Sequence, residues 1–427
     1  MRDAPTILPD ATDAAVVVAR YREVRAAMVA ACEPLSPEDM AVQSMPDASP
    51  VKWHLAHTSW FYETFVLSDP AFGGYRPFDP AFNYLFNSYY DAVGDRHPRP
   101  KRGLLTRPSA ADVFRYRAHV DAAMADRLPQ LSPADLGRLA PVIDLGLNHE
   151  QQHLELLFTD IKHAFAQNPL RPAYRDLPPS SPSAVPTMKW LTFDAGIRRI
   201  GHGGVGFAFD NEGPAHRVFL EPFAIASRLV TCGEFLEFMA DGGYDRPELW
   251  LSDGWHARRQ HEWESPLYWQ RHADRWHLFT LGGMRPVEES EPVCQVSFYE
   301  ADAYARWAGA RLPTEAEWEV ACADVALDGN LLETGTLHPA AASNDGVLKQ
   351  VFGDVWEWTQ SPYSPYPGYR PLAGALGEYN GKFMCNQMVL RGGSCVTPRS
   401  HVRATYRNFF PPEARWQFTG LRLARSA

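Results

Sequence analysis

Two histidines four residues apart are the residues of this sequence that most clearly could do chemistry. His149 and His153 lie within Asn148-His149-Glu150-Gln151-Gln152-His153-Leu154-Glu155. On a helix, side chains four positions apart lie on one face about one turn from each other, so both imidazoles could ligate one transition metal ion. The string also matches the His-Glu-x-x-His pattern of zinc proteases, in which the glutamate is the general base. The spacing therefore predicts two metal ligands and leaves the metal open.

A third ligand is expected from a second helix. Asp160 and His163 follow on the same helix as His153, but they lie two or more turns away, too far to share one ion. His57, in the upstream string Trp53-His54-Leu55-Ala56-His57, is the better candidate, because metal sites in helix bundles take their ligands from facing helices. His54, one turn earlier, is its rival.

Three imidazoles on one side of an ion would leave positions open for substrates. Glu150 points about a quarter turn away from the face of His149 and His153, so we expect three histidines rather than two histidines and one carboxylate. Spacing alone does not choose between iron and zinc. A histidine pair on an exposed helix face, with no metal at all, is an equally good interpretation of that spacing.

The elements that must position these residues are predicted helices in the first part of the chain. Ser-Pro pairs and a Ser-x-x-Asp string mark helix starts, because a serine caps the free N–H groups and proline suits the first turn. Between the second and third helices, residues 71–108 form a long irregular connection, which is often functional. Four helices suggest a bundle with the metal site in its core. The predicted helices span residues 13–32, 49–67, 109–128 and 139–166.

The composition and hydrophobic pattern of the sequence change after a proline-rich stretch. Six prolines between Asn168 and Pro186 indicate an interdomain linker at 169–186. We therefore expect a helical domain at 1–168 and a second domain at 187–427. In the second domain short strand-like runs alternate with glycine turns, helices are expected near 231–241 and 297–308, and 242–292 shows no clear period, which together favour an irregular α+β fold.

Composition excludes several classes of function. The formal net charge of −10 argues against a general nucleic-acid binder. Six scattered cysteines without a Cys-x-x-Cys pair are typical of a reduced protein. The stretch Met1-Arg2-Asp3-Ala4-Pro5 does not resemble a signal segment, and no apolar run is long enough to span a membrane. We expect a cytoplasmic protein that binds neither nucleic acid nor membranes.

The sequence resembles the sulfoxide synthases of ergothioneine biosynthesis (the EgtB type) over nearly its whole length. The resemblance implies a two-domain protein: an all-α, DinB-like four-helix bundle followed by an α+β domain of the formylglycine-generating enzyme and C-type lectin kind. The motifs of the first domain are His54-Leu55-Ala56-His57, Asn87-Ser88-Tyr89-Tyr90, Arg96-His97-Pro98-Arg99-Pro100-Lys101-Arg102 and His149-Glu150-Gln151-Gln152-His153. Those of the second domain are Arg311-Leu312-Pro313-Thr314-Glu315-Ala316-Glu317-Trp318-Glu319, Gly353-Asp354-Val355-Trp356-Glu357-Trp358, Arg391-Gly392-Gly393-Ser394 and Thr419-Gly420-Leu421-Arg422.

The resemblance also implies the chemistry. His57, His149 and His153 would bind a non-haem Fe(II), and the substrates would be N-α-trimethylhistidine (hercynine), O2 and either cysteine or γ-glutamylcysteine. Imidazole and thiolate are both proper iron ligands, and a metal lowers the pKa of a bound thiol. The product would carry a new C–S bond at the imidazole carbon between the ring nitrogens, with the sulfur oxidised to a sulfoxide. Zinc has no redox chemistry and could not support this reaction.

A tyrosine pair is typical of one subgroup of that family. By resemblance, Tyr90 would deliver a proton or hydrogen atom to the oxygen at the iron, with Tyr89 supporting it, and without that step the thiol could take both oxygen atoms. Gln152, between the two histidines of the fourth helix, would hydrogen-bond the histidine substrate. From the residues alone, aromatic packing in a long loop is the better explanation of the two tyrosines.

Further residues are expected to bind the two ends of the substrates. Arg99 and Arg102 would hold the carboxylate of the thiol, because arginine offers a planar double donor; the alternative is a solvated basic loop. Asn408, Phe409 and Phe410 would receive the quaternary ammonium, which aromatic faces and an amide oxygen suit; the alternative is core aromatics beside a proline turn.

Other functions stay open at this point. The same scaffold could use a selenosugar in place of the thiol, or histidine in place of its trimethylated form, as in ovothiol synthesis. A zinc hydrolase with Glu150 as base, and a lectin-like binding module without catalysis, are further alternatives. Formylglycine-generating enzymes use a cysteine pair near the Arg-Gly-Gly-Ser motif, but no second cysteine follows Cys395 at close spacing. We therefore expect no sulfatase modification and a packing role for Cys395.

Overall fold

The chain divides into two compact units in a computed structural model that describes residues 13–178, 183–343 and 346–427. Unit 1 holds the chain up to Gln167 together with Gly203–Asp210 and Arg370–Gly381. Unit 2 holds Asn168–His202, Asn211–Tyr369 and Lys382–Ala427. Residues 179–182 of the predicted linker lie outside the described residues. The boundaries at 168 and 187 stay a prediction, and two short segments of the predicted second domain belong to unit 1.

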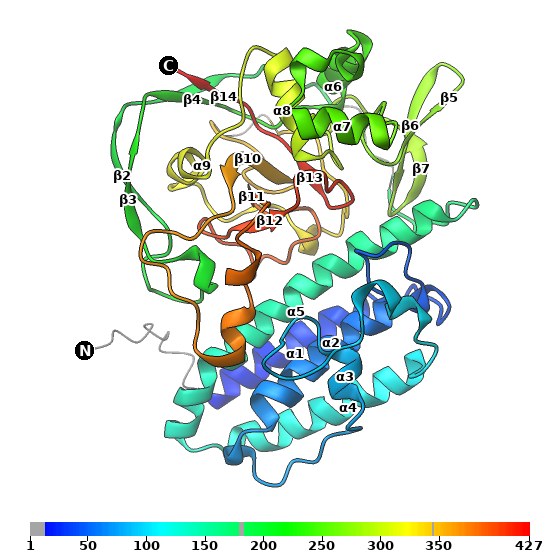
Figure 1. Cartoon of the computed structure of the whole chain (residues 1–427), viewed down its shortest axis with the longest axis vertical. Coiled ribbons are helices and arrows are strands. Elements are labelled where there is room, and N and C mark those ends of the chain that lie inside the picture. Colours follow the sequence, from blue (N-terminus) through cyan, green and yellow to red (C-terminus); the bar gives the residue numbers. More distant parts are fainter. Residues whose placement is uncertain (1–12, 179–182, 344–345) are drawn as a thin grey trace. The chain divides into compact units, whose positions relative to one another are not determined.

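Long helices that lie side by side build unit 1, as predicted (Figure 1). Helix α2 packs against α4 and α5, and α1 packs against α5. Every residue of α2 is buried, so both helix faces that carry histidines meet protein rather than water. A π-helical turn, Glu63–Leu67, continues α2 to the predicted end. The helices are α1 (Ala14–Ala30), α2 (Val51–Tyr62), α3 (Phe82–Phe86), α4 (Ala110–Arg127) and α5 (Pro133–Gln167).

The start of the metal-site helix was predicted six residues too late. Helix α5 begins at Pro133 rather than near Leu139. The Ser132 hydroxyl accepts the backbone N–H of Asp135 at 3.1 Å and donates to its carboxylate at 2.6 Å. This is the same serine–proline start that marks the other helices, so the local signal was present and overlooked.

The long connection after α2 is fixed by one buried carboxylate. Glu63 accepts the hydroxyls of Tyr75 at 2.5 Å and Tyr116 at 2.8 Å, and the backbone N–H of Phe78 at 3.1 Å. The short helix α3 and a 3-10 segment at Arg99–Leu104 interrupt the segment that was predicted to be irregular. The connection is therefore ordered enough to place side chains against α2.

Unit 2 is an α+β domain of small sheets, as predicted. Its largest sheet has the strand order β12-β11-β10-β13, and smaller ones are β1-β4-β14, β5-β6-β7, β2-β3 and β8-β9. The strands β5 to β7 and helix α7 fall in the stretch that showed no period. The strands are β1 (Trp190–Phe193), β2 (Gly196–Ile200), β3 (His216–Leu220), β4 (Phe223–Ala226), β5 (Trp269–His272), β6 (Arg275–Thr280), β7 (Gly283–Pro286), β8 (Gly329–Asn330), β9 (Phe352–Gly353), β10 (Trp356–Pro362), β11 (Met388–Arg391), β12 (Asn408–Phe410), β13 (Thr419–Gly420) and β14 (Ala424–Ser426).

Capping boxes and buried arginines hold unit 2 together. Helices α6, α8 and α9 each begin with a threonine or serine whose side chain is paired with a glutamate three residues later. Arg422 donates to Glu357 at 2.8 Å from two of its nitrogens, and both side chains are fully buried. The helices are α6 (Cys232–Ala240), α7 (Ser252–Gln260), α8 (Phe298–Trp307) and α9 (Glu315–Cys322). In the part of the chain that the structure describes, no helix has the length and apolar character needed to cross a membrane.

Candidate metal centre

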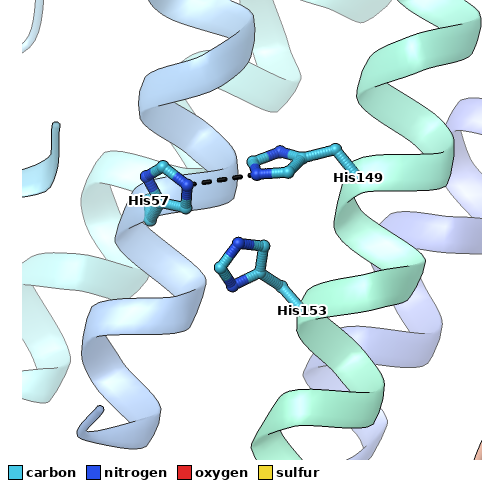
Figure 2. A group of neighbouring side chains, drawn as sticks. All are labelled: His57, His149 and His153. Carbon is cyan, nitrogen blue, oxygen red and sulfur yellow. Dashed lines mark hydrogen bonds between the residues drawn. The ribbon is translucent and has the colours of Figure 1, made fainter. Parts of the chain in front are cut away.

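Three histidines from two facing helices converge in the core of unit 1. His57 comes from α2, and His149 and His153 come from α5, one turn apart (Figure 2). One ring nitrogen of each lies within 4.8 Å of the other two. The Nε2 atoms of His57 and His149 are 3.1 Å apart. Nitrogen lone pairs that face each other at this distance fit a shared metal ion, because an imidazole binds a metal through a bare nitrogen.

Burial keeps these three imidazoles neutral. It lowers the pKa of His57 and of His153 well below the usual value, and the neighbouring histidines add to the shift. The pKa of His149 falls to about 3, through burial first and His54 second. A neutral imidazole retains the lone pair that a metal needs, so the three side chains are in the ligand form at physiological pH.

The ring of His57 is held on three sides. Its Nδ1 donates to the carbonyl of Phe86 at 2.6 Å. It stacks on Trp53 with ring centres 4.6 Å apart and on Trp60 with centres 5.4 Å apart. These two residues are four before and three after His57, so the helix itself builds the stack. The carbonyl fixes the hydrogen on Nδ1 and leaves Nε2 bare toward His149.

His54, the predicted rival, lies outside the group of three. Its Nδ1 is 2.9 Å from Nδ1 of His153, and its Nε2 is 3.0 Å from a carboxylate oxygen of Asp160. Both of its ring nitrogens are therefore engaged with protein partners. The geometry favours His57 as the third ligand.

Glu150 is committed to two arginines. Arg25 donates to one of its carboxylate oxygens at 3.1 Å, and Arg117 donates to the other. All three side chains are buried. Burial alone would lower the pKa of Arg25, but Glu150 and the other acidic groups around it together more than offset this, and the pKa is raised. The carboxylate anchors α5 to α1 and α4, so a general-base role finds no support here.

The tyrosine pair is placed by Asn87. The amide of Asn87 accepts the backbone N–H of Tyr90 at 3.1 Å and donates to the Tyr90 carbonyl at 3.0 Å. Because Phe86, the preceding residue, receives the hydrogen bond of His57, this turn is tied to the metal site. The Tyr90 ring lies 5.6 Å from that of Trp60 and 4.7 Å from that of Tyr89. Burial, followed by the Tyr89 phenol, raises the pKa of Tyr90, which therefore keeps its proton.

Arg102 is a buried cation that donates to uncharged partners. It donates to the hydroxyls of Ser49 at 2.9 Å and Ser88 at 3.2 Å, and its guanidinium lies 3.3 Å from the ring centre of Trp53. Its Nε has no partner among the described residues. Burial, and after it the charge of Arg99, lowers the pKa of Arg102. A bound anion would stabilise the buried charge of Arg102.

Arg99 is placed differently. It is exposed, and its guanidinium donates to the backbone carbonyl of Asp47. It therefore lies at the surface beside Arg102, and its role as a second carboxylate donor stays a prediction.

Tyr379 is a site residue that the sequence did not reveal. Its hydroxyl donates to the side-chain oxygen of Gln152. Its ring is 5.7 Å from His149, 6.1 Å from Tyr89 and stacked on Phe209 at 5.3 Å. Within the same segment, Glu378 accepts the backbone N–H groups of Asp91 and Ala92 at 3.1 and 2.9 Å. No periodicity or spacing links residue 379 to residue 149, because the contact is made only by the folded chain.

Asn408, Phe409 and Phe410 form strand β12 in unit 2. Phe409 stacks on Tyr363 with ring centres 4.0 Å apart, and Asn408 accepts the backbone N–H of Phe409 at 2.9 Å. All three are half-buried. Their role with the substrate stays a prediction.

Comparisons with known proteins agree with this architecture. Residues 20–157 match the DinB superfamily, and residues 176–343 and 337–427 match the sulfatase-modifying factor enzyme 1-like domain. The hercynine oxygenase of Mycolicibacterium thermoresistibile is 33% identical over 407 residues, covering 89% of this chain and 88% of that protein. Those of Mycobacterium tuberculosis (34% over 412 residues; 90% and 93% covered) and Mycolicibacterium smegmatis (33% over 419 residues; 90% and 92% covered) are similar.

Proposed function

Because the chain belongs to the hercynine oxygenase family of ergothioneine biosynthesis, we propose that it is an O2-dependent, non-haem iron sulfoxide synthase. It joins a cysteine-type thiol to the imidazole C2 of N-α-trimethylhistidine. The C–H and S–H hydrogens leave with one oxygen atom as water, and the other oxygen atom stays on sulfur. The observation that carries this proposal is the group of three buried histidines, His57, His149 and His153.

The donor set fits Fe(II). His57, His149 and His153 would hold the ion as three neutral imidazoles, and iron would supply there the redox chemistry that zinc lacks. The burial of the three histidines excludes water from the site. Gln152 and Tyr379, joined by a hydrogen bond, place polar groups beside His149 that can bind the imidazole substrate.

In this proposal the Tyr90 hydroxyl donates a proton to oxygen derived from O2. Tyr90→Phe should lower formation of the C–S product by about a hundredfold or more, the usual scale for a positioned acid. The thiol should instead take both oxygen atoms and leave as its sulfinic acid. Product analysis by mass under O2 measures both outcomes. Tyr89→Phe, a neighbouring control, should change the ratio of sulfoxide to sulfinate less. An unchanged ratio of sulfoxide to sulfinate in Tyr90→Phe would contradict this role.

Arg102 binds the carboxylate of the thiol substrate. Arg102→Met should raise the KM for cysteine by about 10–100-fold, since a hydrogen bond to a charged group contributes roughly 1.5–3 kcal/mol. Cysteamine, which lacks the carboxylate, should react alike with the variant and the parent enzyme. Steady-state O2 uptake with both thiols makes the comparison, and Arg99→Met, measured alongside, tests the second predicted carboxylate donor. Equal losses for cysteine and cysteamine would show that Arg102 only supports the fold.

The decisive experiment is anaerobic loading with Fe(II), followed by O2 and a panel of substrates. Trimethylhistidine plus cysteine or γ-glutamylcysteine should consume O2 and yield the sulfoxide, identified by mass. Histidine or a selenosugar as the preferred substrate would reassign the reaction on the same scaffold. Stoichiometric zinc with no O2 uptake would overturn the proposal.

A further inference from the structure

The imidazole of His54 connects His153 to a buried carboxylate. Nδ1 of His54 lies 2.9 Å from Nδ1 of His153, and Nε2 of His54 lies 3.0 Å from Oδ2 of Asp160. The same Oδ2 accepts the backbone N–H of Ser49 at 2.8 Å, just before α2 begins. All four residues are buried. The result is a continuous row of hydrogen bonds from a carboxylate, through one imidazole, to a second.

With an ionised Asp160 and a neutral His54, the chemistry of this row allows one arrangement of hydrogens. A carboxylate only accepts, so Nε2 of His54 must carry a hydrogen. In a neutral imidazole the other nitrogen is then bare, and Nδ1 of His54 must accept from His153. His153 therefore carries its hydrogen on Nδ1, and its Nε2 is left bare. These positions follow from the partners of each nitrogen.

We propose that Asp160 and His54 form a positioning pair that fixes the tautomer and ring plane of His153, so that its Nε2 is presented to the metal. This inference rests on the proposed metal centre. It gives His153 the support that the carbonyl of Phe86 gives His57. The carboxylate also makes His153 a stronger donor, because negative charge passed along the row raises ligand basicity.

His54→Leu removes the acceptor and fills most of the space. It should weaken metal binding by about 10–100-fold, as loss of a residue that orients a ligand does. His54→Asn keeps an oxygen near the place of Nδ1, so it should retain most of the affinity. In Asp160→Asn the amide oxygen can still accept from both His54 and Ser49, so the variant should keep the tautomer and lose only the effect of the charge.

The measurement is metal affinity of the full-length apoprotein, by competition with a chromophoric chelator. Co(II) serves as the redox-stable probe and Fe(II) is added anaerobically. Nitrogen-15 spectra of the histidines report the tautomer of His153 in the apoprotein. His163→Asn is the matched control: His163 also lies on α5 and is hydrogen-bonded to Ser44 at 2.7 Å, and because it does not hold the ring of His153 its loss should not change metal affinity.

The outcomes separate this inference from the proposed function. A parent protein that binds no metal overturns both. A parent that binds metal, with His54→Leu binding equally well, overturns the positioning pair alone. Equal loss in His54→Asn and His54→Leu would mean that His54 is itself a ligand, which also overturns it. The positioning pair is supported if metal affinity falls from the parent to His54→Asn and again to His54→Leu. In His54→Leu, His153 should also populate both tautomers.

Discussion

His57→Ala is expected to abolish Fe(II) binding and turnover together. The variant leaves two histidines, both from α5, and nothing from α2 to complete the face. The loss should exceed the roughly 10–100-fold that removal of a merely orienting residue costs. Anaerobic equilibrium binding of Fe(II), with O2 uptake on the same samples, measures it. Retention of stoichiometric iron would move the third ligand to another residue, with His54 the first to test.

Loss of a buried ring must be separated from loss of a ligand. His401 is a fully buried histidine in unit 2 that pairs with the hydroxyl of Tyr406 at 3.0 Å. His401→Ala should lower the melting temperature, since it opens a cavity and removes a buried hydrogen bond, yet it should bind iron normally. If both variants lose iron to the same degree, the effect of His57→Ala is one of folding.

The grouping of His149 and His153 with a histidine of a second helix could be predicted because its geometry is local. His149 and His153 share a helix face by periodicity alone, and a Ser-Pro start marks the helix that carries His57. Periodicity does not choose between His57 and His54, because three residues make most of a full helix turn and leave the two side chains on nearly the same face. Which ring reaches His149 depends on the residues of the facing helix. Asp160 of α5 pairs with Nε2 of His54, and His54 therefore lies outside the group of three.

What escaped prediction depends on contacts between distant parts of the chain. Tyr379 and Phe209 belong to unit 1 although both lie in the part of the sequence predicted to form the second domain, and no local pattern marks such a contact. The strands β5 to β7 were missed because their burial does not alternate cleanly: β6 runs from exposed Arg275 to buried Thr280. Arg102 was expected from a basic run, but its burial on Trp53 was not.

Glu150→Ala is expected to lower the unfolding free energy of unit 1 by about 3–5 kcal/mol, the usual cost of leaving a buried charge without its partner. Here the guanidinium of Arg117 would lose its pairing with Glu150 in the buried core, and that of Arg25 would lose one of two carboxylates and keep Asp121 at 2.7 Å. Glu150→Gln keeps the volume and an acceptor, so it should cost less. Chemical denaturation followed by tryptophan fluorescence gives the free energy, with the transition of each unit fitted separately.

The chain supplies its own control for this effect. Arg20 and Asp144 also join α1 to α5, at 2.8 Å, but the arginine side chain is 43% exposed. Asp144→Ala should therefore cost at most about 1 kcal/mol, because solvent screens an exposed pair. A zinc hydrolase would instead need Glu150 free to take a proton from water, and its loss would abolish hydrolysis with little effect on stability. A large loss of stability in Glu150→Ala, with iron binding retained in Glu150→Gln, assigns the carboxylate to the scaffold that holds His149 and His153 in place.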